Sequence, residues 1–175
     1  MSDVRSTEQL LVRPPRRADQ EAYLGLFLDP AVGQWLGRSP TEPLGEGQIL
    51  GMLSADERHW GEYGFGPWVL EERGSGAIVG RGGLRWTELE DGWAVELPWA
   101  VASACWGRGF ATEAARAAIE QAGGLKLPEV IALIVPHNAR SRRVAEKAGL
   151  ELDGETRHAG LAHLVYRCRP APPRD

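Results

Sequence analysis

The sequence predicts an α+β fold, with helices packed on a mixed sheet, and three observations lead to this prediction. Short apolar segments alternate with turn-forming residues through the middle of the chain. Residues 109–122 repeat alanines at helical spacing, and an apolar strand is predicted on either side of this helix. A strand, a helix and a second strand in that order form a crossover whose two strands are parallel.

The first third of the chain is expected to hold one strand and two helical segments. Gln9–Arg13 is predicted as the opening strand, closed by two prolines that follow it. Residues 18–36 place apolar side chains at helical spacing, and Asp29-Pro30 is expected to break this helix in two. A weaker apolar pattern predicts a helix over 48–60, between flanking glycines.

Three strands are predicted next, over 67–71, 77–86 and 93–102, and turn formers separate them. In the third, bulky side chains fall on one face and small ones on the other, apart from the carboxylate of Glu96. Pro98 cannot donate to a sheet ladder, so this strand is expected to lie where neighbouring strands part.

The second half of the chain continues with the helix at 109–122, which Gly123-Gly124 ends. A strongly apolar strand is predicted over 129–135, and a helix over 138–148 that stops at Gly149. Two last strands, at 151–155 and 161–169, are predicted to form a hairpin.

Length and charge restrict the classes of protein to which the chain can belong. Its 175 residues fit one domain, 1–175, with a frayed tail at 170–175. Twenty Lys and Arg against 24 Asp and Glu give 20 − 24 = −4, so we expect no nucleic-acid partner. No run of 18 apolar residues or signal-peptide core is present, so no membrane association is expected either. The two cysteines form no Cys-x-x-Cys pair, which favours a reducing, cytoplasmic setting.

The segment from Cys105 to Thr112 has the features of an anion-binding loop. Gly107 and Gly109 permit a close backbone approach to a ligand, and the helix that follows presents unpaired N–H groups at its positive end. Arg108 can add a charge-assisted contact to a phosphate. A short Gly-x-Gly before a helix is also ordinary turn chemistry, so both readings stay open. Neither the P-loop nor the dinucleotide-binding glycine pattern is present.

Six segments together resemble the GNAT superfamily of acetyl-CoA-dependent N-acetyltransferases, and in particular its branch of ribosomal-protein N-terminal acetyltransferases. The segments are Leu10–Asp19, Ile78–Gly80, Glu96–Val101, Trp106–Ala114, Asn138–Ser141 and Glu146–Leu150. The resemblance implies a mostly antiparallel sheet of about seven strands, with helices on both faces and a splayed parallel pair formed by its fourth and fifth strands. Two positions depart from the family pattern. Trp106 stands where Gln or Arg is usual, although this is familiar in the branch, and Pro98 stands where Gly is common.

The resemblance also implies acetyl-CoA as co-substrate. Main-chain N–H groups from Gly107 to Thr112 would hold its pyrophosphate, and the backbone of Trp99 to Val101 would pair with the pantetheine arm. Asn138 would contact the same arm, although an Asn at this place is also a preferred helix N-cap. The expected cofactor-binding residues are Trp99, Ala100, Val101, Trp106, Gly107, Arg108, Gly109, Phe110, Ala111, Thr112, Asn138 and Ser141.

The expected chemistry is direct attack of a neutral amine on the acetyl group in a ternary complex. Glu96 is the candidate base, because a partly buried carboxylate has a raised pKa; its alternative is a structural ion pair with an arginine. Ser141 is the candidate proton donor to the departing thiolate, with an ordinary surface serine as the alternative. The N–H of Val101 is the candidate for the oxyanion contact.

The sequence indicates no metal site, because the spacing of His158 and His163 puts them on opposite faces of a strand. Segments 34–63 and 157–163 are expected to wall the acceptor pocket. The acceptor is expected to be a protein N-terminal amine or a small-molecule amine, and the protein a monomer or a homodimer. The alternative function is a CoA-binding sensor or interaction module that performs no catalysis.

Overall fold

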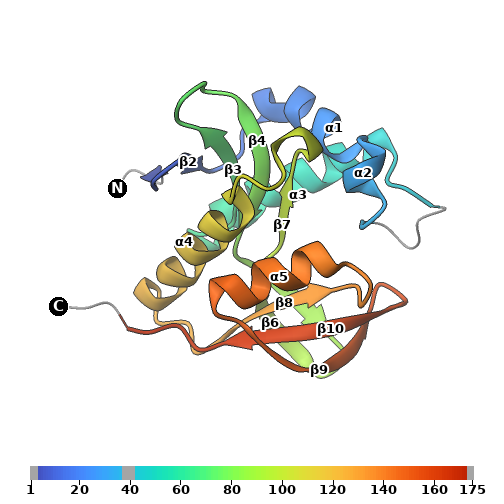
Figure 1. The fold of residues 1–175 in the computed structure, drawn as a ribbon, viewed down its shortest axis with the longest axis vertical. Coiled ribbons are helices and arrows are strands. Elements are labelled where there is room, and N and C mark those ends of the chain that lie inside the picture. Colours follow the sequence, from blue (N-terminus) through green and yellow to red (C-terminus); the bar gives the residue numbers. More distant parts are fainter. Residues whose placement is uncertain (1–3, 37–41, 173–175) are drawn as a thin grey trace.

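The computed structural model describes residues 4–36 and 42–172, which form two five-stranded sheets with helices packed on them (Figure 1). The strand order of the first sheet is β1-β2-β3-β4-β7, and that of the second is β5-β6-β8-β10-β9. The strands of the first sheet are β1 (Arg5–Ser6), β2 (Leu10–Arg13), β3 (Pro67–Glu72), β4 (Ile78–Gly83) and β7 (Trp99–Val101). Those of the second are β5 (Arg85–Leu89), β6 (Gly92–Glu96), β8 (Val130–Ile134), β9 (Glu151–His158) and β10 (Leu161–Cys168).

The helices lie close to the predicted positions. They are α1 (Gln20–Phe27), α2 (Pro30–Gly33), α3 (Glu46–Tyr63), α4 (Phe110–Gly124) and α5 (Ala139–Ala148), with 3₁₀ turns at Arg17–Asp19 and Ser103–Cys105. The break at Asp29-Pro30 is confirmed: the carboxylate of Asp29 accepts a 2.9 Å hydrogen bond from the N–H of Ala31 and so caps α2. The helix predicted over 48–60 extends over 46–63 in the structure. It begins directly after Gly45, and Gly64, which has a φ of 70°, stops it.

Helices cover both faces of the first sheet, as expected. Trp68 and Leu70 of β3 are fully buried in one hydrophobic cluster with Ala114, Ala115 and Ala118 of α4. Val69 lies between them in the sequence and packs in a separate cluster with residues of α1 and α3. Since successive side chains of a strand point to opposite faces, α4 covers one face of the sheet, and α1 and α3 cover the other.

Two of the predicted central strands are each divided between the two sheets. Together with β1, which was not predicted, this gives ten strands in the described residues rather than about seven. The segment predicted as one strand over 77–86 leaves the first sheet as β4 and enters the second as β5. Gly83, at the junction, has a φ of 128°, and a Cβ there would lie 2.8 Å from the carbonyl oxygen of Gly66. Only glycine fits this close approach without strain.

The segment predicted over 93–102 is likewise divided into β6 and β7, and the break falls at Leu97-Pro98. Strand β6 runs parallel to β8, where Glu96 lies opposite Ile131. The N–H of Leu97 donates to the carbonyl oxygen of Ile131 at 2.8 Å, and Pro98 has no N–H to continue the ladder. Strand β7 then pairs with β4 instead. The predicted splayed parallel pair is therefore confirmed, and Pro98 lies where it opens.

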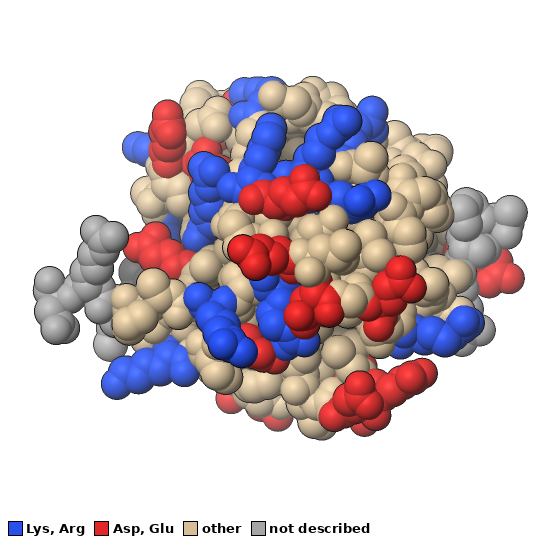
Figure 2. Space-filling model, turned by 60° about the horizontal axis from the view of Figure 1, so that its bottom comes forward, with Lys and Arg blue, Asp and Glu red and all other residues tan. Residues whose placement is uncertain are grey.

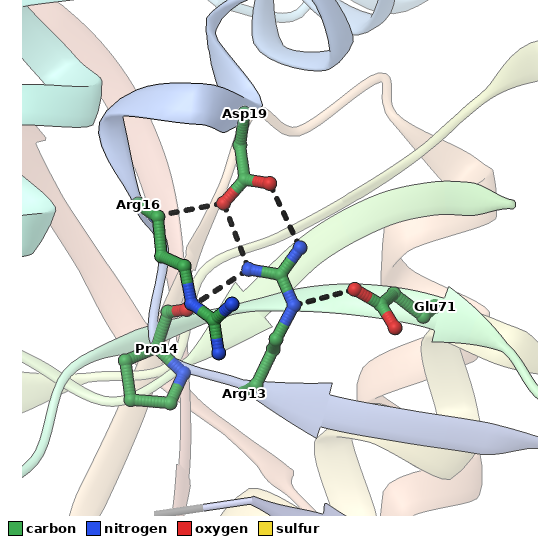
Figure 3. Close-up of polar contacts among 5 residues, drawn as sticks. All are labelled: Arg13, Pro14, Arg16, Asp19 and Glu71. Carbon is green, nitrogen blue, oxygen red and sulfur yellow. Dashed lines mark hydrogen bonds and ion pairs between the residues drawn. The ribbon is translucent and has the colours of Figure 1, made fainter. Parts of the chain in front are cut away.

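A buried ionic cluster ties β2 to β3 and to the first 3₁₀ turn (Figure 3). Both terminal nitrogens of Arg13 donate to the carboxylate of Asp19 at 2.8 Å, and its Nε pairs with Glu71. The backbone N–H of Arg16 also donates to Asp19 at 2.7 Å. Although burial acts against the ionised carboxylate, these donors hold the pKa of Asp19 below its ordinary value.

The face that comes forward in Figure 2, when the bottom of Figure 1 is turned toward the viewer, carries acidic and basic side chains side by side. On the second sheet, for example, Arg167 of β10 pairs with both Glu129 and Asp153. In the part of the chain that the structure describes, no helix is both long and apolar enough to cross a bilayer.

Candidate active site

A cleft of about 1210 Å³ lies where the two sheets part. One wall is formed by β7, the loop after it and the first turn of α4. The other is formed by β8, the first part of α5 and the β9–β10 turn, and residues of α3 close one end. The cleft therefore lies beside the parallel pair that opens at Pro98.

The cleft brings together the residues predicted for the site, with the exception of Arg108. Those that line it are Glu96, Trp99, Ala100, Val101, Trp106, Gly107, Gly109, Phe110, Ala111, Thr112, Asn138 and Ser141. The side chain of Arg108 instead pairs with Glu72 of β3, and its guanidinium lies 4.5 Å from the centre of the Phe110 ring. In this conformation Arg108 fastens the loop to the first sheet and does not face the cleft.

The loop before α4 turns through two left-handed glycines. Gly107 has a φ of 80° and Gly109, the residue that caps α4, a φ of 88°. No side chain within residues 4–36 and 42–172 hydrogen-bonds to the first turn of α4, so its N–H groups are available to a ligand. The carboxylate of Glu113 faces the other way and accepts hydrogen bonds from the N–H of Gln9 at 2.7 Å and of Leu10 at 3.2 Å. Glu113 therefore fixes the position of the loop relative to β2.

Trp106 connects this loop to β7. Its indole N–H donates to the carbonyl oxygen of Val101 at 2.8 Å, and the guanidinium of Arg140 lies 4.1 Å from the centre of its ring. The residue that departs from the general family pattern thus satisfies a backbone group at the open edge of the first sheet.

The open edge of β7 faces the gap between the sheets. The N–H of Ala102 donates to the carbonyl oxygen of Val79, on the β4 side. Because alternate residues of an antiparallel strand direct their backbone groups to opposite sides, those of Trp99 and Val101 point away from β4. The N–H of Val101 is therefore directed into the gap.

Asn138 and Ser141 lie together at the start of α5. The side chain of Asn138 is buried, and its Oδ1 accepts a 3.2 Å hydrogen bond from the N–H of Ser141. The N-cap interpretation of Asn138 is thus confirmed, and a ligand contact from its amide NH₂ remains compatible with it. Ser141 lines the cleft one turn into the helix.

Glu96 is buried, with 6% of its surface exposed, and its carboxylate is hydrogen-bonded to two residues of β5. Its Oε2 accepts hydrogen bonds from Nε of Arg85 at 2.8 Å and from the hydroxyl of Thr87 at 2.6 Å. Burial alone would raise the pKa of Glu96, but Arg85 and Thr87 together outweigh burial and lower it. The expectation of a raised pKa is therefore wrong, and the ion pair with an arginine, the alternative interpretation, is present.

One set of cleft residues was not identified from the sequence, whereas the two histidines of the cleft belong to segment 157–163, which was predicted to wall the acceptor pocket. Arg140, Arg143 and Lys147 of α5 line the cleft and make one rim of it basic. The run Arg-Ser-Arg-Arg at 140–143 was the available signal for this rim. His158 and His163 also line the cleft, close to Glu96. Within residues 4–36 and 42–172, no three His, Cys, Asp or Glu side chains are grouped as a metal site would need.

Comparisons with known proteins agree with this geometry. The family model described as an acetyltransferase (GNAT) domain matches residues 9–151. The uncharacterized protein YkkB of Bacillus subtilis (strain 168) is 30% identical over 162 residues, which are 91% of this chain and 92% of that protein.

Solved structures share the fold. An acetyltransferase from Agrobacterium tumefaciens str. C58 superposes with a TM-score of 0.81 at 28% identity, covering 95% of this chain and 94% of its own. A ribosomal-protein-S5-alanine acetyltransferase from Vibrio fischeri has a TM-score of 0.70 at 17% identity, covering 95% and 96%. At that identity, the second likeness shows a common fold alone.

Proposed function

The chain belongs to the GNAT acetyltransferase family, and from this membership we propose that it transfers the acetyl group of acetyl-CoA to a primary amine within a ternary complex. The observation that carries the proposal is the cleft between the diverging strands β7 and β8, which has an uncapped helix N-terminus at its edge. Ligand pockets commonly measure about 300–1,000 Å³. A cleft of about 1210 Å³ has room for a donor and an acceptor together.

The donor end of the cleft suits a molecule that carries several phosphates. The N–H groups from Gly107 to Thr112 and the positive end of α4 would hold the pyrophosphate. The basic rim of Arg140, Arg143 and Lys147 would attract the negative charges of the donor, although the chain as a whole has a charge of −4. The N–H groups at the start of α4 and the basic rim would both bind phosphate groups, and neither requires a side chain that recognises the rest of the nucleotide.

The open edge of β7 would bind the extended arm of the donor in the manner of an added strand. Strand addition uses backbone N–H and C=O groups that a sheet leaves unpaired, and Trp99 and Val101 present such groups to the gap. The N–H of Val101 would then stabilise the negative charge that develops on the acetyl oxygen. Asn138, held as the cap of α5, lies across the same cleft.

Two side chains would assist the reaction at the thioester. The hydroxyl of Ser141 lines the cleft and would donate a proton to the departing thiolate. Glu96, whose pKa is lowered, remains ionised at neutral pH and would place a negative charge near a cationic amine. Its electrostatic role thus fits the structure better than the role of base.

The acceptor we propose is a protein N-terminal amine, with a small-molecule amine as the competing class. The proposal rests on the resemblance of the sequence motifs to the ribosomal-protein branch. An acidic net charge favours the approach of any cationic acceptor and does not separate the two classes.

The proposal is tested by measuring acetyl-CoA binding by calorimetry and thiol release in the same samples, with N-terminal peptides, alkyl amines and aminoglycosides as acceptors. Binding with acceptor-dependent release is expected. Binding without release across the panel would favour the non-catalytic module.

A glycine variant tests the phosphate loop. Gly109→Glu is expected to abolish acetyl-CoA binding, because it adds a side chain and a negative charge at a φ of 88° beside the cleft. Gly64→Glu is the control, since Gly64 has a φ of 70° at the end of α3, is exposed and does not line the cleft. Equal affinity in the two variants would refute the assignment of the loop.

A further inference from the structure

Two histidines stand together in the wall of the cleft that the β9–β10 hairpin forms. The ring centroids of His158 and His163 are 5.9 Å apart, and the rings meet edge to face at 75°. The chain reverses at Ala159-Gly160, so the two residues lie on different strands. His158 pairs across the hairpin with Leu161, and His163 lies two residues further along β10, on the same face. The expectation that they point to opposite faces is therefore wrong.

The titratable groups around His158 come from β5, β6, β9, β10 and the β5–β6 turn. Glu96 of β6 favours the protonated ring, whereas Arg85 of β5 and His163 of β10 disfavour it. Glu88, Glu90 and Arg157 lie with His158 around a shallow pocket on its other side. Burial has the largest effect, and the pKa of His158 is lowered from 6.5 as a result. The ring is thus neutral at pH 7 and able to accept a proton.

Hydrogen bonding distinguishes His158 from its neighbours in the cleft. The carboxylate of Glu96 already accepts from Arg85 and Thr87, and a ring nitrogen of His163 lies 3.1 Å from the carbonyl oxygen of Leu161. Neither ring nitrogen of His158 has a hydrogen-bond partner among the described residues, although the side chain lines the cleft beside Glu96. A neutral imidazole with a free nitrogen next to a fixed negative charge is the arrangement that a proton acceptor for an ammonium group requires.

We propose that His158 is the general base that takes a proton from the acceptor ammonium group, and that Glu96 stabilises the imidazolium so formed. The inference rests on the proposed acetyl transfer and assigns a residue to it. His158 removes one proton from R–NH₃⁺, and the lone pair of R–NH₂ forms the C–N bond with the acetyl carbon. The C–S bond breaks, the thiolate receives the hydroxyl proton of Ser141, and Ser141 is reprotonated by the second proton that the nitrogen loses. His158 then returns its own proton to solvent, so that R–NH₃⁺ and acetyl-CoA give the amide, CoASH and H⁺.

The test compares His158→Gln with His163→Gln in the full chain, using the panel amine that supports the fastest thiol release. General-base catalysis contributes about 10²–10⁴-fold, so kcat of His158→Gln at pH 7 is expected to fall by about that factor. The affinity for acetyl-CoA, measured by calorimetry, is expected to stay within about twofold of wild type, because the donor end of the cleft is unchanged. The matched control, His163→Gln, is expected to lose much less activity.

The pH profile separates a base from a structural residue. Wild-type kcat/KM is expected to level off above the pKa of His158 and to stay level up to the pKa of the amine. Without the base, only the neutral amine reacts, so kcat/KM of His158→Gln is expected to rise about tenfold per pH unit throughout this range. A wild-type-like plateau in His158→Gln, or retention of more than a tenth of kcat, would overturn the proposal.

An NMR titration of wild-type protein provides a readout that does not depend on turnover. The His158 ring signal, assigned by its loss in His158→Gln, is expected to titrate below pH 6.5 in wild type. In Glu96→Gln it is expected to titrate lower still, because a charge that favours imidazolium is gone. Titration above pH 7 in wild type would overturn the proposal. Wild-type protein that binds acetyl-CoA but releases no thiol with any acceptor would instead overturn the proposed function, and this inference with it.

Discussion

Replacing Gly80 by alanine should damage both the fold and the donor end of the cleft. A Cβ at Gly80 would lie 2.4 Å from the carbonyl oxygen of Ala100, whereas ordinary van der Waals contact begins at 3.4 Å. The two strands would have to separate by about 3.4 − 2.4 = 1.0 Å at this point. Because the obstacle is backbone rather than a flexible side chain, β7 itself must move.

The size of the effect follows from that displacement. Overpacking in a close-packed region costs about 1–3 kcal/mol, so the free energy of unfolding of Gly80→Ala should fall by that amount. One edge of β7 pairs with β4, and the opposite edge faces the cleft. A displacement of reacting groups by about 1 Å can reduce a catalytic rate by about a hundredfold. Both acetyl-CoA affinity and turnover are therefore expected to fall.

Gly82→Ala is the matched control on the same strand. A Cβ there would meet the carbonyl oxygen of Pro98 at 3.5 Å and the Cβ of Ala114 at 3.8 Å, both ordinary contacts. Urea unfolding would give the stabilities, calorimetry the affinities and thiol release the rates. If Gly80→Ala matches Gly82→Ala within about 0.5 kcal/mol and binds acetyl-CoA as tightly, then β4 does not set the position of β7 and the reasoning is refuted.

Three further predictions concern charges. Asp19→Ala should lower the free energy of unfolding by about 3 kcal/mol, since the buried Arg13 loses one of its two carboxylate partners and keeps Glu71 and the carbonyl oxygen of Pro14. Asp153→Ala at the more exposed Arg167 pair should cost less than about 1 kcal/mol. The pKa of Asp19 is lowered on folding, so the ionised carboxylate adds fully to the free energy of unfolding above the unfolded pKa of about 3.9. This stabilisation disappears as the pH falls through the folded pKa, so the free energies of unfolding of wild type and Asp19→Asn, measured with urea, should converge at that low pH. Replacing Arg143 and Lys147 by Gln should raise the Kd of acetyl-CoA and make this Kd less dependent on salt concentration, while Arg5→Gln on β1 should change neither. If the Kd of the double variant depends on salt as steeply as that of wild type, the basic rim does not attract the donor. Glu96→Gln should leave acetyl-CoA affinity intact and lower kcat less than His158→Gln does; an unchanged rate and pH profile would remove Glu96 from the mechanism.

The sequence predicts the helices well because their ends have local chemical causes. Asp29 caps α2 through its own carboxylate, and Gly64 and Gly149 end α3 and α5 in the left-handed conformation. The two divided strands were missed because alternation of side chains does not reveal which sheet a strand joins. Pro98 indicated the opening of the sheet, but the steric demand at Gly83 arises from Gly66, which lies far from it in the sequence.

The site was predicted where it depends on local motifs and was missed where it depends on pairing between distant strands. The loop from Trp106 to Thr112, with the exception of Arg108, lies in the cleft as expected, because its glycines and the following helix are adjacent in the chain. The pKa of Glu96 could not be predicted, since Arg85 and Thr87 reach it from another strand. The histidine pair likewise forms only because the hairpin register brings β9 and β10 together.

Under the proposed function, the division of the sheet would bring binding and chemistry to one place in this fold. Strands that part leave backbone N–H and C=O groups without partners, and a buried group in that state costs about 1–3 kcal/mol. Trp106 satisfies one of them, the carbonyl oxygen of Val101, from the same loop that presents N–H groups at the start of α4. The groups that still face the gap can be satisfied by a ligand with an extended amide-bearing arm. Because Glu96 ends β6 just before the break and β7 begins just after it, such an arm would be brought directly to the ionised carboxylate and to the neutral His158 beside it.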